Sequence, residues 1–154
     1  MEVLVAPWRY DYVTGKIGRS EGCPFCDLKA EDCLFYGQHC AVVMNAYPYA
    51  TGHVMVVPLR HTSDLLHLTD QEHKEFFDLG RRALKALRAA FGPQGVNMGI
   101  NLGEAAGAGV ATHLHCHLVP RWQGDHNFMQ VAAGTSVLPM TVEAAFETLK
   151  KVWQ

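Results

Sequence analysis

The stretch Thr112-His-Leu-His-Cys-His-Leu-Val-Pro-Arg-Trp122 contains three histidines, His113, His115 and His117, at a strict spacing of two residues. Apolar residues fill the alternate positions, which is the period-two pattern of a half-buried β-strand. We therefore expect a strand with imidazoles on one face and core residues on the other. Pro120 should end its pairing, because proline has no N–H to donate. With a rise of about 3.3 Å per residue, successive rings should stand about 7 Å apart.

Neutral imidazole is nucleophilic near pH 7, and a fixed histidine therefore suits a two-step phosphoryl transfer. A single histidine on a strand is more often a hydrogen-bonding partner, and a His-x-His pair alone could equally supply two zinc ligands. Three histidines in register, followed by Pro-Arg-Trp, favour a functional site. Positioning and charge stabilisation around the nucleophile should then supply most of the catalysis.

The segment His113-Leu-His-Cys-His-Leu-Val119 resembles the histidine-triad motif of nucleotide hydrolases and transferases, His-φ-His-φ-His-φ-φ, where φ is apolar. This resemblance implies that the middle histidine, His115, is the nucleophile and that His117 contacts the phosphoryl group. His53, in a Gly-His-φ-φ-φ-φ-Pro segment, is a further catalytic candidate, although it could simply make a hydrogen bond at the start of a strand. Asn45 matches the asparagine that the family associates with the nucleoside.

A loop of small residues precedes the triad. Successive backbone N–H groups can bind an anion. We therefore expect an anionic phosphate to contact side chain or backbone groups of Asn101, Gly107, Ala108, Gly109 and Val110. Many histidine-triad proteins carry Ala-Gly-Gln-Ser/Thr-Val here, and the glutamine amide and the hydroxyl contact phosphate. This chain has neither side chain, so its phosphate contacts should be mainly backbone.

Further segments resemble the branch of the family that includes bacterial diadenosine tetraphosphate phosphorylases. They are Ala6-Pro-Trp-Arg9, Asn101-Leu-Gly103, Ala106-Gly-Ala-Gly109, Pro120-Arg-Trp122, Gly124-Asp125 and Asn127-Phe128. The resemblance implies attack by His115 on the α-phosphorus of a dinucleoside polyphosphate, with phosphate or water resolving the intermediate, and it implies a homodimer. Trp122 could stack on a base or ribose, or anchor the core or the dimer interface. Alternative functions are a nucleoside phosphoramidate hydrolase and a non-catalytic nucleotide-binding module.

Cys23-Pro-Phe-Cys26 could place two thiolates on one tetrahedral zinc ion. In metal-binding histidine-triad proteins the other ligands are a histidine after Pro-x-Arg and the first histidine of the triad, which correspond here to His61 and His113. The resemblance thus implies one structural zinc and no organic cofactor. Two alternatives are a glutaredoxin-type redox pair and cysteines with no metal.

The composition indicates a single domain over residues 1–154, with residues 1–22 as an N-terminal arm. A net charge of −2 gives no electrostatic footprint for nucleic acid. The chain has no run of 18 apolar residues and no signal-peptide pattern, so we expect no membrane insertion. Five scattered cysteines favour a reducing, cytoplasmic location.

The remaining elements follow from local patterns. Residues 40–46 and 53–59 should form a hairpin, and residues 96–102 and 127–132 two further strands. A capping-box pattern, Thr69-Asp-Gln-Glu72, should start a long helix that ends before Gly92-Pro93, with its charged residues on a solvated face. A shorter helix should start at Thr141. Together these elements predict an α+β fold, histidine-triad-like, with a mainly antiparallel sheet, one long and one short helix.

Overall fold

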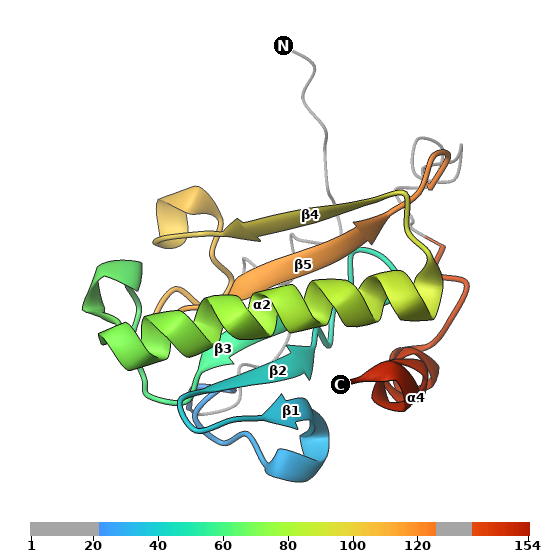
Figure 1. Ribbon diagram of the computed structural model, residues 1–154. Coiled ribbons are helices and arrows are strands. Elements are labelled where there is room, and N and C mark those ends of the chain that lie inside the picture. Colours follow the sequence, from blue (N-terminus) through green and yellow to red (C-terminus); the bar gives the residue numbers. More distant parts are fainter. Residues whose placement is uncertain (1–21, 126–136) are drawn as a thin grey trace.

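A five-stranded antiparallel sheet carries the long helix across one of its faces (Figure 1). The computed structural model describes residues 22–125 and 137–154, so the expected arm at 1–22, apart from Gly22, and the expected strand at 127–132 lie outside the described residues. The strands have the spatial order β1-β2-β3-β5-β4. Their bounds are Cys33–Tyr36 for β1, Cys40–Met44 for β2, Val54–Pro58 for β3, Gly95–Ile100 for β4 and Cys116–Arg121 for β5. The α+β expectation is confirmed.

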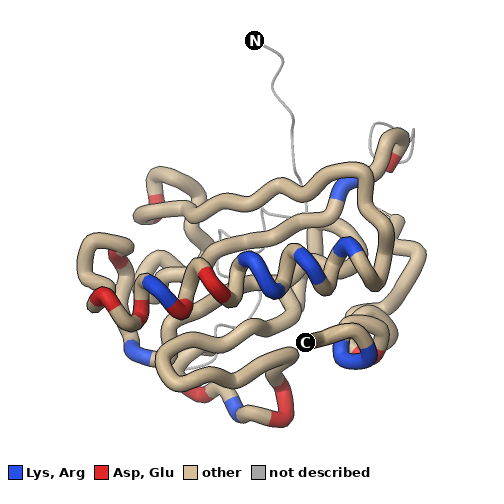
Figure 2. Tube along the Cα trace, in the orientation of Figure 1, with Lys and Arg blue, Asp and Glu red and all other residues tan. Residues whose placement is uncertain are grey.

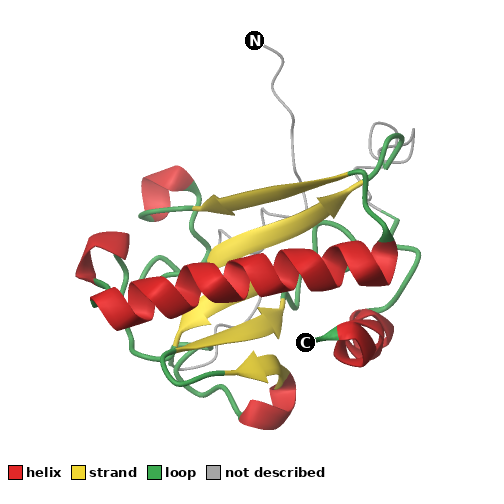
Figure 3. Ribbon diagram, in the orientation of Figure 1, coloured by secondary structure: helices red, strands yellow, loops and turns green. Residues whose placement is uncertain are grey.

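Both predicted helices form, and each begins at its predicted cap. Helix α2 spans Asp70–Phe91, and at its start Thr69 accepts from the Glu72 amide while the Glu72 carboxylate accepts from the Thr69 amide. It ends at Gly92, whose φ of 54° is a left-handed conformation that glycine adopts without strain. Helix α4 spans Val142–Val152 behind Thr141 and packs against α2 (Figure 3).

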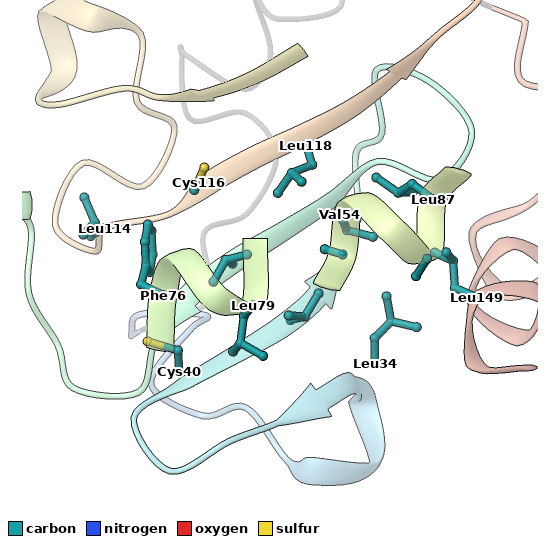
Figure 4. Packing of buried hydrophobic residues seen from close by; sticks show 14 residues of the cluster. Leu34, Cys40, Val54, Phe76, Leu79, Leu87, Leu114, Cys116, Leu118 and Leu149 are labelled. Atoms are coloured by element: carbon teal, nitrogen blue, oxygen red, sulfur yellow. The ribbon is translucent and has the colours of Figure 1, made fainter. Parts of the chain in front are cut away.

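The main core lies between α2 and the sheet (Figure 4). Phe76 and Leu87 of α2 are fully buried, and alternate residues of the strands meet them, among them Val54 and Leu118. Burying each of these large side chains contributes about 1.5 to 3 kcal/mol. Leu114, Cys116 and Leu118 all lie in this core, so the predicted alternation in the histidine segment is confirmed and the histidines face the other way.

The opposite face of the sheet has a second, smaller core, which the sequence patterns did not predict. Its buried residues are Phe25, Cys33, Ala41, Val43, Met55 and Val57. Strands β2 and β3 are therefore buried on both faces. This second face is the one that carries His117, since His117 is the cross-strand partner of Met55.

Three expectations about strands need correction. Strand β1 was not expected; it forms because it pairs with β2 along one edge of the sheet. The strand expected at 96–102 forms as edge strand β4 over Gly95–Ile100, so Leu102 lies beyond it, and Met98 and Leu102 are 47% and 48% exposed. Pro120 does not end the pairing of β5, because β5 stays paired with β4 through Arg121.

Charged residues occur along the whole of α2 (Figure 2), and most of them are exposed or half exposed, whereas Glu72 is buried. Lys74 and Arg81 both pair with Asp78, one helical turn away, at 2.7 and 3.4 Å. Ion pairs of this exposed kind contribute only a few tenths of a kcal/mol. No helix among the described residues is long and apolar enough to cross a membrane.

Candidate active site and metal-ligand cluster

The histidine segment leads into β5 from a turn that ends near His113. Strand β5 begins at Cys116, so His113 and His115 precede it and only His117 lies within the paired strand. The rings of His115 and His117 have centroids 4.9 Å apart, closer than the expected spacing of about 7 Å, and are inclined at 78°. The two imidazoles are therefore in direct edge-to-face contact.

The hydrogen bond of His115 defines which of its nitrogens can act as a nucleophile. Its Nδ1 lies 2.8 Å from the carbonyl oxygen of His113, and His115 is 4% exposed. A carbonyl oxygen only accepts, so Nδ1 carries the proton. In a neutral ring Nε2 then keeps its lone pair, and this nitrogen can attack an electrophile.

A second chain of hydrogen bonds orients His117. The Tyr49 backbone N–H donates to Nδ1 of His53 at 3.1 Å, and Nε2 of His53 lies 2.9 Å from Nδ1 of His117. Burial, with smaller contributions from His117 and His115, lowers the pKa of His53 to about 3, so its ring is neutral at physiological pH. Because its Nδ1 accepts, its Nε2 must be the donor to His117. A neutral His117 then carries its proton on Nε2, as a hydrogen-bond donor beside His115.

Asn45 lies next to this chain and also shapes the turn between β2 and β3. Its Oδ1 accepts from the Tyr47 amide at 2.8 Å, and its Nδ2 lies 3.4 Å from Nε2 of His53. Since that Nε2 donates to His117, the Asn45 amide group is a neighbour of His53 rather than its hydrogen-bond partner. The structure thus brings Asn45, His53, His115 and His117 together, and contact of Asn45 with a nucleoside stays a prediction.

Some amides of the small-residue loop that were expected to contact phosphate are hydrogen-bonded within the loop itself. The Gly107 amide donates to the Glu104 carbonyl at 2.9 Å, and the Ala108 amide donates to the Gly103 carbonyl at 3.4 Å. Nδ2 of Asn101 donates to the Gly107 carbonyl at 3.4 Å and so ties the end of β4 to the loop. Within the described residues, the amides of Gly109 and Val110 make no such bond. These two amides remain the best backbone candidates for contact with phosphate.

Trp122 lies at the far end of β5. The six residues of β5 lie between it and His115, and the seven steps along the chain correspond to roughly 20 Å at about 3.3 Å per residue. Its neighbour Arg121 pairs with Asp125 at 2.6 Å and donates to Oδ1 of Asn97 at 3.1 Å. The structure therefore does not bring Trp122 to the triad of its own chain.

Cys23, Cys26, His61 and His113 form a single cluster in which one potential ligand atom from each residue lies within 4.8 Å of the others. Nδ1 of His113 is 3.2 Å from Sγ of Cys23, and Nδ1 of His61 is 3.2 Å from Sγ of Cys26. Bonds of about 2.3 Å to sulfur and 2.0 Å to nitrogen would place tetrahedral ligands about 3.6 Å apart. The donor set therefore fits a tetrahedral, thiolate-binding ion.

The surroundings of His113 favour a ligand role. Its Nε2 lies 2.8 Å from the Pro58 carbonyl and must donate to it, which leaves the lone pair on Nδ1, towards the thiols. The residue is 1% exposed, and burial lowers its pKa, so the ring is held in the neutral form that binds metal.

The other cysteines have no comparable setting. Burial raises the pKa of Cys40 to about 12 and that of Cys116 to about 11, so both stay thiols in the core.

The turn that contains Cys23 and Cys26 leads through a short 3-10 turn at Ala30–Asp32 into β1, not into an α-helix. A glutaredoxin-type dithiol is expected to open a helix, so the local structure does not match the redox alternative.

Comparison with known proteins agrees with this geometry. A family model described as the HIT domain matches residues 29–124. The chain belongs to the HIT family. The protein is 42% identical over 111 residues to AP-4-A phosphorylase of Mycobacterium tuberculosis, covering 72% of this chain and 57% of that protein. It thus spans less than two thirds of that relative's length. It is also 32% identical over 111 residues to Protein hit of Bacillus subtilis, covering 69% of this chain and 76% of that one.

Solved structures share the fold. A Zn-bound histidine triad family protein from Mycobacterium smegmatis superposes with a TM-score of 0.69 at 26% identity, covering 86% of this chain and 93% of that chain. A hypothetical histidine triad nucleotide-binding protein from Sulfolobus tokodaii gives a TM-score of 0.70 at 21% identity, covering 84% and 91%, and shows likeness of fold alone. The predicted membership of the histidine-triad superfamily is confirmed.

Two residues of the site were missed by sequence reasoning. Tyr49 supplies the amide that fixes the tautomer of His53, and its ring packs on the His53 ring with centroids 4.7 Å apart. The ring of Phe25 contacts both His113 and His115. The only feature of the sequence that pointed to Phe25 as a site residue was its position between two candidate metal ligands. An apolar residue in a Cys-x-x-Cys turn does not by itself indicate contact with a site distant in the sequence.

Proposed function

We propose that the protein is a nucleotidyl hydrolase or transferase that cleaves dinucleoside polyphosphates, such as diadenosine tetraphosphate, through a covalent nucleotidyl-His115 intermediate. The observation that carries the proposal is the pair of opposite tautomers: His115 has an available lone pair on Nε2, and His117 beside it has an N–H on Nε2. A nucleophile and a donor side by side suit attack on a phosphoryl group. The similarity to AP-4-A phosphorylase supports the choice of substrate.

In the first step Nε2 of His115 forms a bond to the α-phosphorus, and the bond from that phosphorus to the oxygen of the leaving nucleotide breaks. Positive charge develops on the His115 ring, and the His113 carbonyl that accepts from its Nδ1 stabilises this charge. The N–H of His117 donates to a phosphoryl oxygen or to the leaving oxygen, and the His53 chain keeps it oriented for this.

In the second step the oxygen of an inorganic phosphate or a water attacks the same phosphorus. The N–P bond breaks, the attacking group gives up a proton, and His115 returns to its neutral form. Phosphate yields a nucleoside diphosphate and water yields a nucleoside monophosphate. The amides of Gly109 and Val110, which make no backbone hydrogen bond within the described residues, are the proposed contacts for the phosphate chain, with Asn45 at the nucleoside.

We further propose that Cys23, Cys26, His61 and His113 hold one structural zinc ion. The donor set and its spacing support this assignment, as does the Zn-bound protein from Mycobacterium smegmatis. When bound, the ion would cross-link the Cys23–Cys26 turn to the histidine segment. A site with four protein ligands leaves no open position for substrate, so its role is to stabilise the structure.

A homodimer and a reducing cytoplasmic compartment complete the proposal. Strand β4 is at the edge of the sheet and pairs only with β5 among the described residues; it contains no charged residue or proline, and Met98 within it and Leu102 just beyond it are half exposed. Such an edge is suited to pairing with the same strand of a second copy. None of the five cysteines forms a disulfide, and a reducing compartment preserves that state.

The test is to mix the protein with diadenosine tetraphosphate, quench with base, and measure the intact mass and the modified peptide, with and without inorganic phosphate. We expect an adduct of adenosine monophosphate mass on the peptide that contains His115. Product analysis should give ATP with ADP when phosphate is the acceptor, and ATP with AMP when water is.

The variant His115→Ala should lose the adduct and nearly all turnover, while it still binds nucleotide. The matched control is His73→Ala, because His73 is an exposed histidine on α2, on the other side of the sheet from the triad. Normal turnover by His115→Ala would contradict the proposed nucleophile. Cleavage of adenosine phosphoramidate without cleavage of the dinucleotide would assign the site to a different nucleotide substrate.

A further inference from the structure

Phe25 occupies an unusual place between the two candidate thiol ligands. Its neighbours Pro24 and Cys26 are exposed, whereas Phe25 is only 8% exposed. Its ring centroid is 5.3 Å from the ring of His113 and also 5.3 Å from the ring of His115, at angles of 71° and 40°. One apolar side chain therefore contacts both a candidate metal ligand and the candidate nucleophile.

The position of Phe25 is restrained from two directions. Its ring belongs to the second core with Met55 and Val57 of β3, which fixes it against the sheet. Its backbone belongs to a turn closed by the Cys26 amide, which donates to the Cys23 carbonyl at 3.1 Å. The two cysteines on either side face His61 and His113. These two restraints hold the ring of Phe25 in one position.

The orientation of the His115 ring depends on contacts with neighbouring side chains. Its bond to the His113 carbonyl fixes one nitrogen, but the terminal torsion of a histidine is broad and one hydrogen bond leaves the ring room to swing. His117 limits the swing on one side, with ring centroids 4.9 Å apart. The ring of Phe25 provides a second contact, and together the two rings restrict the direction of Nε2. Displacement of a reacting atom by about 1 Å can cost about 100-fold in rate.

We infer that Phe25 is a positioning residue that holds the ring of His115 in its attacking orientation and links the Cys23–Cys26 turn to the nucleophile. This inference rests on the proposed role of His115. The Cys23–Cys26 turn then has a function beyond stability. Any interaction that holds this turn against His61 and His113 also holds Phe25 against His115. Loss of the aromatic ring should lower the rate of the covalent step and leave nucleotide binding nearly unchanged.

The experiment compares Phe25→Ala and Phe25→Leu with Val43→Ala. Val43 is a matched control, because it is a buried residue of the same second core and lies on β2, which β3 separates from β5. For Phe25→Ala we expect kcat to fall about 10- to 100-fold with KM within about twofold, and for Phe25→Leu a partial recovery of kcat. Val43→Ala should lower the melting temperature while kcat stays close to wild type. Metal content should remain the same in all three variants.

A second measurement does not depend on turnover. Nitrogen NMR of the free protein reports the tautomer and mobility of His115, and Phe25→Ala should broaden or shift its Nε2 signal while Val43→Ala leaves that signal in place. An unchanged His115 signal in Phe25→Ala, or an equal loss of kcat in Val43→Ala, would overturn the inference. If the wild type turns over no nucleotide, the proposed function fails, and the NMR comparison alone still decides whether Phe25 positions His115. If Phe25→Ala does not fold, Phe25→Leu carries the same comparison.

Discussion

Replacing His53 by phenylalanine removes the hydrogen bond that orients His117 and keeps a ring of similar size in place. His53 is fully buried, its Nδ1 accepts from the Tyr49 amide, and its Nε2 donates to Nδ1 of His117 at 2.9 Å. The variant leaves Nδ1 of His117 without this donor. The proton of His117 is then no longer held on the nitrogen that we expect to face the phosphoryl group.

The magnitude follows from the cost of an unmade hydrogen bond. Removal of one partner of a buried pair costs about 1 to 3 kcal/mol. The upper limit is the complete loss of one oxyanion donor, about 3 to 4 kcal/mol, which corresponds to replacing His117 itself. At about 1.4 kcal/mol for each factor of ten in rate, we expect His53→Phe to lower kcat about 10- to 100-fold. The loss should be smaller for His53→Phe than for His117→Ala, and smaller for both than for His115→Ala.

The assay is steady-state cleavage of diadenosine tetraphosphate together with single-turnover formation of the nucleotidyl adduct. His73→Phe on α2 is the control, because it makes the same substitution at an exposed histidine. The reasoning is refuted if His53→Phe keeps its full rate of adduct formation. It is also refuted if only KM rises, since His53 would then bind substrate instead of orienting His117.

Three further predictions concern stability. The Glu72 carboxylate accepts from Arg60 at 2.7 Å, and this contact and the Thr69 bonds lower its pKa from 4.5 to about 2. The contribution of Glu72 to the free energy of unfolding should therefore be full above about pH 4.5 and be lost as the pH falls towards 2. A Glu72→Gln variant whose acid unfolding curve matches that of the wild type in this window would contradict the prediction. Cys26→Ala should abolish metal binding and lower the melting temperature, as measured by metal analysis and calorimetry, whereas Cys40→Ala, on the other face of the sheet, should keep its metal. Phe76→Ala should cost about 3 to 5 kcal/mol of unfolding free energy in urea, because Phe76 of α2 is fully buried against the sheet, and a loss below about 1 kcal/mol would show that the core repacks around it.

Local patterns in the sequence were enough to predict most of the regular structure. The helix from Asp70 to Phe91 is encoded by its capping box and by the glycine that follows it, and both signals act over a few residues. The alternation around His115 likewise determines which side chains share a face, because successive residues of an extended chain point to opposite sides. The resemblance to the family then brought together Cys23, Cys26, His61 and His113, which span 90 residues of sequence.

Interactions between distant segments decided the rest. Strand β1 has no strong pattern of its own and exists because β2 offers it a pairing edge, and β3 is buried on both faces because Phe25 and its neighbours cover the side opposite α2. The tautomers of the histidines also belong to the tertiary structure. Each ring can carry its proton on either nitrogen, and the choice depends on whether a carbonyl of His113 or an amide of Tyr49 lies within hydrogen-bonding distance. The sequence determines that the imidazoles share one face, and only the folded chain, by fixing these partners, determines that His115 presents a lone pair while His117 presents a proton.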